Sequence, residues 1–354
     1  MVAWEEACAY PGRSVLYVPQ GTFFVGETVF SGPCFNDLSP KVLILGTLRA
    51  PTALDDADVW IHFKSLHHLD ITGGDTNTTA ILDGQGAQTW SNSACRRHFT
   101  CDIFATSLKL SDVSYGRVSN IEVVDSKGFH VALHGCDNIH LSGFNIRAPG
   151  DSQNTDGIHV SQSTNINITS SDIGVGDDCV SIGPGSVNVS VSDINCGPGH
   201  GISVGSLGRY QNEMDVVGIR VENCSINGTT NGVRIKTWPG QHSSIATNLT
   251  FQNIVMSNVS NPIVIDQQYC PNHSCKTHEA SNVKLSEIKM RNISGSYNSE
   301  FAVNLQCSSG KACEKIELSY INLTATQPPD QNHQIGRFNC NGALHAFTIL
   351  NSTF

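Results

Sequence analysis

Residues 219–226 read Ile-Arg-Val-Glu-Asn-Cys-Ser-Ile, and this pattern of apolar-x-apolar-x-x-(apolar or small)-x-apolar decides the fold. Similar octets recur at 139–146, 166–173, 187–194, 249–256, 283–290 and 316–323. Alternation over three or four residues predicts a short strand with one buried face, and the two-residue step predicts a bend before a second strand. The final apolar positions of successive octets are 21 to 34 residues apart, which is typical of stacked coils rather than of a sandwich.

One such coil cannot bury its inner face alone, so stacking must create a continuous column of Ile, Val, Leu and Phe. Asn138 and Asn248, which precede octets, suit turns because Asn tolerates left-handed backbone. A leucine-rich repeat would have a tighter period, and a β-propeller would need longer units of four strands. The pattern therefore predicts an all-β, right-handed parallel β-helix of about ten coils, with residues 1–354 as a single domain.

The composition agrees with this fold and excludes several classes of function. The chain has 354 residues, of which 32 are Gly, with only 7% aromatic and 15% charged residues. Such a composition suits a long, turn-rich β structure better than a helical bundle. The formal net charge is −10 and no run of Lys and Arg is present, so we expect no nucleic-acid partner. No apolar run reaches transmembrane length, so we expect no membrane partner.

The thirteen cysteines are too many for an ordinary reduced cytosolic enzyme. Three pairs lie at short spacings without the doubled CxxC pattern of a structural zinc site, namely Cys95–Cys101, Cys270–Cys275 and Cys307–Cys313. Eleven Asn-x-Ser/Thr sequons also favour secretion to the extracellular space or cell wall. Since no signal peptide is visible, we expect the chain to begin after a removed or truncated N-terminal segment.

Three aspartates fall at corresponding places in neighbouring coils. Asp156 comes just before an expected strand at 158–160, and Asp177 and Asp178 come just before one at 180–182. Stacked strands are about 4.8 Å apart, so the carboxylates should lie side by side on one outer face. A single Asp in a β protein is usually a turn residue. Three in register raise one another's proton affinity, which is tolerated mostly where it serves acid–base chemistry.

The following coils supply His200, which is bracketed by glycines, and then Arg234 and Lys236. Residues two apart leave the same face of a strand, so Arg234 and Lys236 should act together. A solvated surface pair is the plainer alternative. Because the chain is acidic and has few cations, we predict that these two provide the local positive charge for a polyanionic substrate.

Together these segments resemble the signature motifs of the polygalacturonase family of glycoside hydrolases, in the same order and about one coil apart. The motifs are Asn154-Thr155-Asp156-Gly157, Gly176-Asp177-Asp178-Cys179, Gly199-His200-Gly201 and Arg234-Ile235-Lys236. The chain is most similar to plant members, and two further stretches resemble pollen-type, exo-acting enzymes, Gly208–Val216 and Asp266–Asn272. The resemblance implies a right-handed parallel β-helix with a helical N-terminal cap, which we expect to be partial here.

The resemblance also implies roles for individual residues. Asp177 corresponds to the general acid of an inverting hydrolysis, Asp156 and Asp178 to the pair that activates water, and His200 to the histidine that supports the proton on the acid. An inverting pair of carboxyl groups needs about 6.5–9.5 Å between them to hold that water. The implied substrate contacts are Asn154, Arg234, Lys236 and Tyr269. We expect a monomer that acts on polygalacturonate or pectin with no cofactor and no metal.

Three other interpretations stay open. A pectate-lyase-like β-helix would cleave the same polymer by elimination, with calcium held by the aspartates, although the Gly-His-Gly and Arg-x-Lys segments argue against it. A hydrolase of the same fold could be specific for rhamnogalacturonan or xylogalacturonan. A catalytically inactive β-helix could bind wall polysaccharide or be a structural or allergenic wall protein, but the presence of all three aspartates argues against that class.

Overall fold

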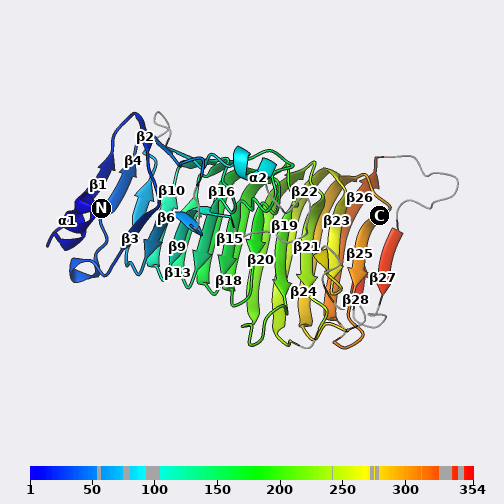
Figure 1. Cartoon of the computed structure of the whole chain (residues 1–354). Coiled ribbons are helices and arrows are strands. Elements are labelled where there is room, and N and C mark those ends of the chain that lie inside the picture. The colour runs from blue at the N-terminus through cyan, green and yellow to red at the C-terminus, as the bar shows by residue number, and fades with distance from the viewer. Residues whose placement is uncertain are drawn as a thin grey trace. The chain divides into compact units, whose positions relative to one another are not determined.

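The computed structural model describes residues 1–53, 57–74, 80–92, 104–240, 242–271, 275, 279–311, 313–326, 337–341 and 347–354. Strands dominate, and the chain divides into two compact units, Met1–Asp177 and Asp178–Phe354. Within each unit, every strand runs parallel to the equivalent strand of the next coil (Figure 1). The single domain expected for residues 1–354 stays a prediction.

The first unit opens with helix α1 (Val2–Ala9), which contacts the first strand. Trp4 of this helix is buried against Phe30 with ring centroids 5.1 Å apart, and its indole N–H donates to the Ser31 carbonyl (3.0 Å). The disulfide Cys8–Cys34 links the helix to the coil below it. The expected helical cap is therefore present in this segment.

Two faces of parallel strands build the first unit. One face contains β3 (Thr28–Ser31), β6 (Val59–Lys64), β9 (Thr106–Ser111), β12 (Val131–His134) and β15 (Ile158–Ser161). The other face has two rows that both end at β16 (Thr164–Gly174). The first row is β1 (Val15–Val18), β4 (Lys41–Ile44), β7 (Asp70–Thr72), β10 (Ser114–Ser119) and β13 (Asp137–Ser142). The second is β2 (Thr22–Phe24), β5 (Thr47–Arg49), β8 (Ala80–Asp83), β11 (Ile121–Val124) and β14 (Asn145–Arg147). The short helices are η1 (Phe35–Asp37) and α2 (Ala87–Asn92).

The second unit repeats this arrangement with longer strands. One ladder is β17 (Val180–Ile182), β19 (Ile202–Leu207), β21 (Asn231–Thr237), β23 (Asn261–Asp266), β25 (Phe301–Gln306) and β27 (Arg337–Asn341). The other is β18 (Val187–Cys196), β20 (Val216–Asn227), β22 (Ile245–Val259), β24 (Lys284–Tyr297), β26 (Glu314–Ala325) and β28 (Phe347–Leu350). The second ladder carries the octets, and the first carries the polar motifs.

In the frames that the strand pairing gives, which for two octets are 189–196 and 288–295, the bend inside each octet is made by its fifth residue, which has left-handed backbone with φ between 49° and 66°. The residues at this position are Gly143, Ser170, Asp193, Asn223, Asn253, Asn292 and Tyr320. Asn is common there because it adopts this conformation at low cost. The Asn side chains also bond from coil to coil, since Asn253 donates to Asn223 (3.1 Å) and Asn292 donates to Asn253 (3.0 Å).

Two of the predicted octets are wrong in their frame. In the structure Val189 pairs with Ile219, and Ile288 pairs with Leu249. Apolar residues flank both octets and fit the same loose pattern, so hydrophobicity alone could not choose between two frames. The corrected octets are 189–196 and 288–295.

The core is the predicted column of inward-facing aliphatic side chains. In the second unit, one row of it comes from successive octets and is almost entirely excluded from solvent: Val191, Val221, Phe251, Met290 and Leu318. Because period-two alternation sends the intervening residues outward, the same stacking that buries this row presents a polar residue from every coil on the outer face. The same alternation in the ladder that contains β17, β19 and β21 positions the site described below.

Four disulfides occur among the described residues: Cys8–Cys34, Cys179–Cys196, Cys270–Cys275 and Cys307–Cys313. Two of these join cysteines that the sequence singled out for their short spacing, whereas Cys95 and Cys101 lie outside the described residues. Cys136 and Cys224 are buried free thiols, and burial raises the pKa of each to about 11. They are therefore protonated and unreactive at ordinary pH.

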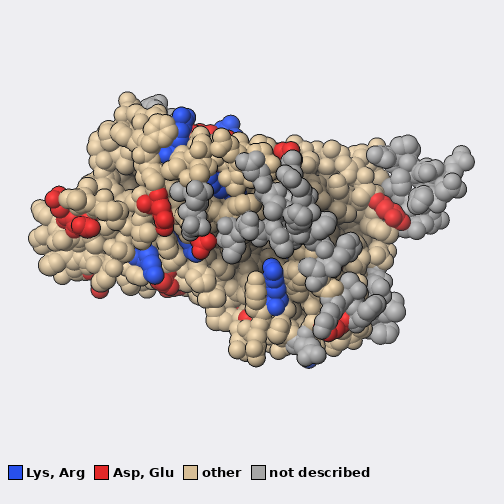
Figure 2. Space-filling model, in the orientation of Figure 1, with Lys and Arg blue, Asp and Glu red and all other residues tan. Residues whose placement is uncertain are grey.

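The described surface is sparsely charged. On the face shown in Figure 2, Lys, Arg, Asp and Glu side chains are scattered with mixed sign over a mostly uncharged surface. Such a surface, on a chain of net charge −10, gives a polyanion no long-range attraction. Within the described residues, no helix is long and apolar enough to cross a membrane.

Candidate active site

The second unit brings several predicted site residues to the polar ladder. Asp178 and His200 each lie two residues before a paired position, because Val180 of β17 pairs with Ile202 of β19. They therefore occupy equivalent places in neighbouring coils. Arg234 and Lys236 lie inside β21 and point to the same side, as their spacing predicts.

Asp178 is deeply buried, with only 1% of its side chain exposed. Its Oδ1 accepts from the Ser203 hydroxyl (2.7 Å) and from Arg234 Nη2 (3.0 Å), and its Oδ2 accepts from Lys236 Nζ (2.7 Å). Burial alone would raise the pKa of Asp178, but the adjacent Lys236 and Arg234 outweigh burial and hold this pKa below its ordinary value. Asp178 is therefore a carboxylate at neutral and mildly acidic pH, and it suits a role that needs an acceptor rather than a proton donor.

Arg234 and Lys236 are themselves largely buried, with 13% and 9% of their side chains exposed. Two cations that share one carboxylate leave a cluster with a single net positive charge. Breaking such a buried arrangement by removing one partner is costly, because the remaining charges lose their compensation. The binding of a substrate carboxylate by these two cations stays a prediction. In the structure they also donate to Asp178 and help to keep it ionised.

Tyr269 lies over this cluster. Its ring centroid is 5.8 Å from the Arg234 guanidinium carbon and 5.3 Å from Lys236 Nζ, which are cation–π distances. Its backbone N–H donates to the Thr237 carbonyl (3.1 Å), so the turn after β23 is tied to the end of β21. The structure thus brings Tyr269 together with Arg234 and Lys236. The substrate contact that the family resemblance implies for Tyr269 stays a prediction.

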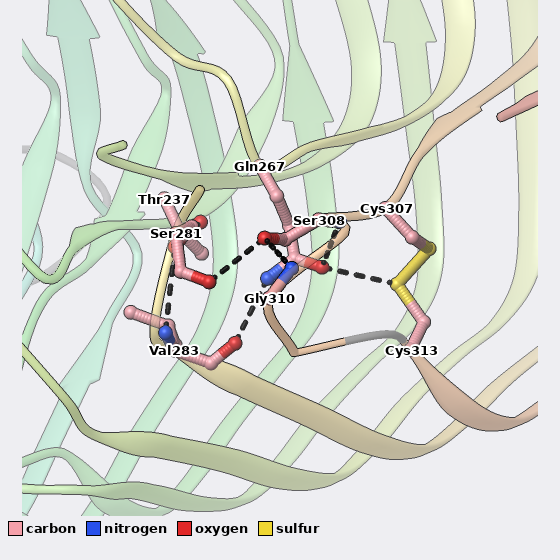
Figure 3. The surroundings of a disulfide bond; sticks show 8 residues. All are labelled: Thr237, Gln267, Ser281, Val283, Cys307, Ser308, Gly310 and Cys313. Atoms are coloured by element: carbon pink, nitrogen blue, oxygen red, sulfur yellow. Dashed lines mark hydrogen bonds between the residues drawn. A yellow bond between two sulfur atoms is a disulfide. The ribbon is translucent and has the colours of Figure 1, made fainter. Parts of the chain in front are cut away.

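A buried polar network fixes the turn that leads to Tyr269 (Figure 3). Gln267 is fully buried; its Nε2 donates to the Val283 carbonyl (2.8 Å), and its Oε1 accepts from the Ser308 N–H (2.9 Å). The disulfide Cys307–Cys313 closes the short loop that carries Ser308. Because every polar group of a buried network needs its partner, this arrangement leaves the turn little freedom to move.

The same network also reaches the strand that carries the cations (Figure 3). The Ser308 hydroxyl donates to the Ser281 carbonyl (2.8 Å), and the Ser281 hydroxyl bonds with the Thr237 hydroxyl (2.8 Å). Thr237 directly follows Lys236 in β21. The network therefore fixes the backbone of the two segments that carry Lys236 and Tyr269.

In the first unit, Asp156 is almost completely buried, and Asn154 has left-handed backbone with φ 55°. The Thr155 hydroxyl accepts from the Gly176 N–H (3.0 Å), so the segment with Asp156 is bonded to the segment that leads into Asp177. A side chain at Gly176 would clash, because a Cβ there would lie 1.8 Å from a backbone oxygen. The two acidic segments of the first unit therefore lie next to each other, as expected.

Behind Asp156 lies His130, to which no sequence motif points. Its backbone N–H (2.8 Å) and its ring Nδ1 (3.0 Å) both lie within hydrogen-bond distance of the Asp156 carbonyl, and the Ser126 N–H donates to its Nε2 (3.4 Å). Burial lowers the pKa of His130 to about 4, so the ring is neutral and Nδ1–H is the donor. The only sequence signal was its place one coil before Gly157, just ahead of β12.

Comparison with known proteins shows the family to which the chain belongs. The family model for glycosyl hydrolases family 28 matches residues 8–342. The chain belongs to this family. An exopolygalacturonase of Platanus acerifolia is 42% identical over 92% of this chain and 85% of its own length. A polygalacturonase of Gossypium barbadense is 41% identical over 91% of this chain and 78% of its own length.

A solved structure supports the fold of this family 28 hydrolase. The endo-xylogalacturonan hydrolase from Aspergillus tubingensis covers 96% of this chain and 93% of its own, with a TM-score of 0.80 and 22% identity. At that identity the likeness shows the fold alone, which is the right-handed parallel β-helix expected from the repeat.

The sequence motifs point to no role for two residues beside Asp178, Arg234 and Lys236. Ser203 pairs with Arg234 across the ladder, and its hydroxyl both donates to Asp178 and accepts from Arg234 Nε (3.3 Å). Asp266 pairs with Lys236 in the next strand, and burial raises the pKa of its carboxyl. Counting positions along the stacked strands could have found both residues, because each lies directly beside a predicted cation.

Two features beside His200 and Asp178 constrain the site, namely the backbone at Gly201 and the charges around Asp178. Gly201 has φ 81°, and a Cβ there would lie 2.1 Å from the Asn231 carbonyl oxygen, so glycine is needed beside His200. Asp178 and His200 are of types that can ligate a cation. However, Asp178 already receives two positive side chains, which a divalent ion would have to displace. The absence of a metal in the reaction stays a prediction that this charge balance favours.

Proposed function

We propose that this family 28 hydrolase is a polygalacturonase, which hydrolyses α-1,4 bonds between galacturonic acid residues of polygalacturonate or pectin. Family membership supports glycoside hydrolysis, and the names of the plant relatives support this substrate. The observation that carries the proposal is Asp178, a buried carboxylate that Arg234 and Lys236 keep ionised. A site of this kind can hold a water for attack beside an anionic sugar.

The proposed reaction is an inverting displacement. Asp177 donates a proton to the glycosidic oxygen while the bond from that oxygen to the anomeric carbon breaks. Asp178 and Asp156 orient a water on the opposite face of the sugar, and one of them takes its proton as the new bond to carbon forms. The departing chain leaves as an alcohol and the attacked sugar as a hemiacetal, so Asp177 must regain its proton before the next turnover. His200, in the coil after Asp178, supports the proton on Asp177.

Substrate capture is local in this proposal. The acidic chain and the mixed charges of Figure 2 give a polyuronate no distant attraction. The net positive charge of the Asp178, Arg234 and Lys236 cluster binds one galacturonate carboxylate, and the Tyr269 ring limits where that sugar can lie. Asn154, in the segment that carries Asp156, makes a further substrate contact.

Three finer properties belong to the proposal. The name of the Platanus relative supports exo action, in which the enzyme releases sugar from the chain end. The disulfides, which form and persist in oxidising compartments, support secretion to the cell wall. We also propose that the enzyme is a monomer.

The test measures reducing ends released from polygalacturonate by the parent protein and by Asp177→Asn, which keeps shape but removes the transferable proton. We expect turnover to fall by about 10²–10⁴-fold with an unchanged melting temperature, since this is the usual contribution of general acid–base catalysis. Exo action would yield monogalacturonate as the only early product. A parent protein that releases no reducing ends, or that forms unsaturated products absorbing in the ultraviolet, would rule out the proposal.

A further inference from the structure

The loop that follows β19 carries an arginine that the mechanism above does not use. This loop starts beside the cationic strand, because the Leu207 carbonyl accepts from the Trp238 N–H (2.8 Å). The Glu213 carboxylate then accepts from three successive backbone N–H groups, those of Gly208 (2.6 Å), Arg209 (2.9 Å) and Tyr210 (2.7 Å). A carboxylate that closes its own loop in this way gives the exposed segment a defined shape.

Within that loop, Arg209 is exposed but held in place by aromatic rings. Its guanidinium carbon lies 4.9 Å from the Trp238 ring centroid and 5.3 Å from the Tyr210 ring centroid. Among the described residues, no carboxylate lies within ion-pair distance of this guanidinium. Stacking occupies the face of a guanidinium and leaves its N–H groups, which lie in its plane, able to donate to a carboxylate.

The aromatic side chains connect Arg209 to the proposed catalytic cluster. Trp238 meets Tyr269 edge to face, with ring centroids 5.7 Å apart, and Tyr269 lies over Arg234 and Lys236. Two cationic positions therefore flank one aromatic surface within the same unit. The two positions differ in how free their cations are to bind a ligand, since Arg234 and Lys236 pair with the buried Asp178 and Arg209 pairs with no carboxylate among the described residues.

We propose that Arg209 is a second carboxylate-binding residue, which takes the free carboxylate of a galacturonate next to the one held at the Arg234 and Lys236 cluster. This inference rests on the proposed polygalacturonase function and adds a specificity to it. A polyuronate offers one carboxylate on every sugar, whereas methyl esterification removes that charge. Arg209 would therefore favour unesterified neighbours, with Trp238 and Glu213 as the residues that position it.

The test titrates trigalacturonate, by calorimetry, into Asp177→Asn protein with and without Arg209→Gln. We expect Arg209→Gln to raise the Kd roughly tenfold, because a charge-assisted hydrogen bond to a carboxylate is lost. The Kd of Arg209→Lys should lie between those of the parent and of Arg209→Gln, since lysine keeps the charge without the planar donors. The matched control is Arg220→Gln, an exposed arginine of β20 that pairs with Glu222, and it should leave the Kd unchanged.

A second ligand separates charge recognition from general binding. Fully methyl-esterified trigalacturonate should bind the two Arg209 forms with equal Kd, because it has no carboxylate for Arg209 to hold. Equal affinity of both forms for unesterified trigalacturonate would overturn the inference, as would an equal loss with both ligands. Since Arg209 is exposed, its variants should keep the parental melting temperature.

The outcome is separable from that of the proposed function. A parent protein that releases reducing ends from polygalacturonate, together with an unchanged Kd in Arg209→Gln, overturns only the role of Arg209. A parent protein that neither cleaves polygalacturonate nor binds trigalacturonate in its Asp177→Asn form overturns both.

Discussion

Asp178 of the second unit and His130 of the first are both buried ionisable side chains beside proposed catalytic segments, yet they respond to burial in opposite ways. Asp178 keeps its charge because Arg234 and Lys236 donate to it, and its pKa is lowered in spite of burial. Among the described residues, the hydrogen-bond partners of His130 are backbone groups, including the Asp156 carbonyl, and burial lowers its pKa to about 4 and leaves it neutral. The molecule thus places a buried charge where chemistry needs one and a neutral ring where only support is needed.

The strongest way to break this contrast is to remove the charge of Asp178. Asp178→Asn leaves Arg234 and Lys236 side by side without their anion. We expect activity on polygalacturonate to fall below detection and the free energy of unfolding to drop by about 3–5 kcal/mol, which is typical when one partner of a buried ion pair is lost. Initial rates and denaturant unfolding would measure both effects.

The matched control for this variant is Asp193→Asn, in which an exposed aspartate of β18 with left-handed backbone becomes a residue that also accepts that backbone. It should alter neither rate nor stability. If Asp178→Asn were as stable as the parent protein, the two ion pairs would contribute nothing net to the fold.

A smaller change is expected from Lys236→Met, which removes one of the two cations. Loss of the ion pair with substrate should lower kcat/KM by the equivalent of about 2–5 kcal/mol. Removal of Lys236 also takes away a cause that lowers the pKa of Asp178. Asp178 would then protonate at higher pH, so the acidic limb of the kcat/KM profile should move to higher pH.

Lys289→Met, an exposed lysine of β24, serves as the control for that profile. An acidic limb that stays in place in Lys236→Met would mean that Lys236 does not set the charge of Asp178. If kcat/KM were also unchanged, the result would favour the plainer alternative, in which Lys236 is an ordinary surface charge.

His130 should make the free energy of unfolding depend on pH between 6.5 and about 4. Its folded pKa of about 4 lies below its ordinary 6.5, so between these values the unfolded chain binds a proton that the folded chain does not. Stability is therefore complete above pH 6.5 and declines as the pH falls toward 4, by about 3 kcal/mol in total. The Asp178 contribution is lost only at lower pH, below its ordinary value of 3.8.

The measurement is urea unfolding at several pH values between 7 and 4 for the parent protein and for His130→Asn. Asn can still donate to the Asp156 carbonyl but cannot be protonated, so the variant should lack the decline assigned to His130, whatever its stability at pH 7. Identical slopes in the two proteins would show that His130 is not the group that titrates.

The contrast also explains what the sequence could predict. The strands and the place of each polar motif follow from the repeat, because one coil fixes the position of the next, and the common face of Arg234 and Lys236 follows from alternation. The helical cap does not follow from the repeat and was implied only by the family resemblance. The partners of those cations do not follow, since Asp178 is far from both in the chain and either cation could equally have faced the substrate. The roles of His130 and Arg209 could not be predicted from the sequence. That of His130 depends on its contact with a backbone carbonyl, and that of Arg209 depends on the folded shape of its loop.

The smallest expected effect concerns metal removal. The positive charge beside Asp178 comes from Arg234 and Lys236, and hydrolysis by carboxyl groups needs no Lewis acid. We therefore expect that dialysis against EDTA leaves the rate of reducing-end release unchanged, and that added calcium does not raise it. The lyase interpretation makes the opposite prediction, because elimination would draw on calcium held by Asp156, Asp177 and Asp178. Activity that disappears in EDTA and returns with calcium would mean that the two cations do not supply the positive charge the reaction uses, and the contrast drawn between Asp178 and His130 would lose its catalytic meaning.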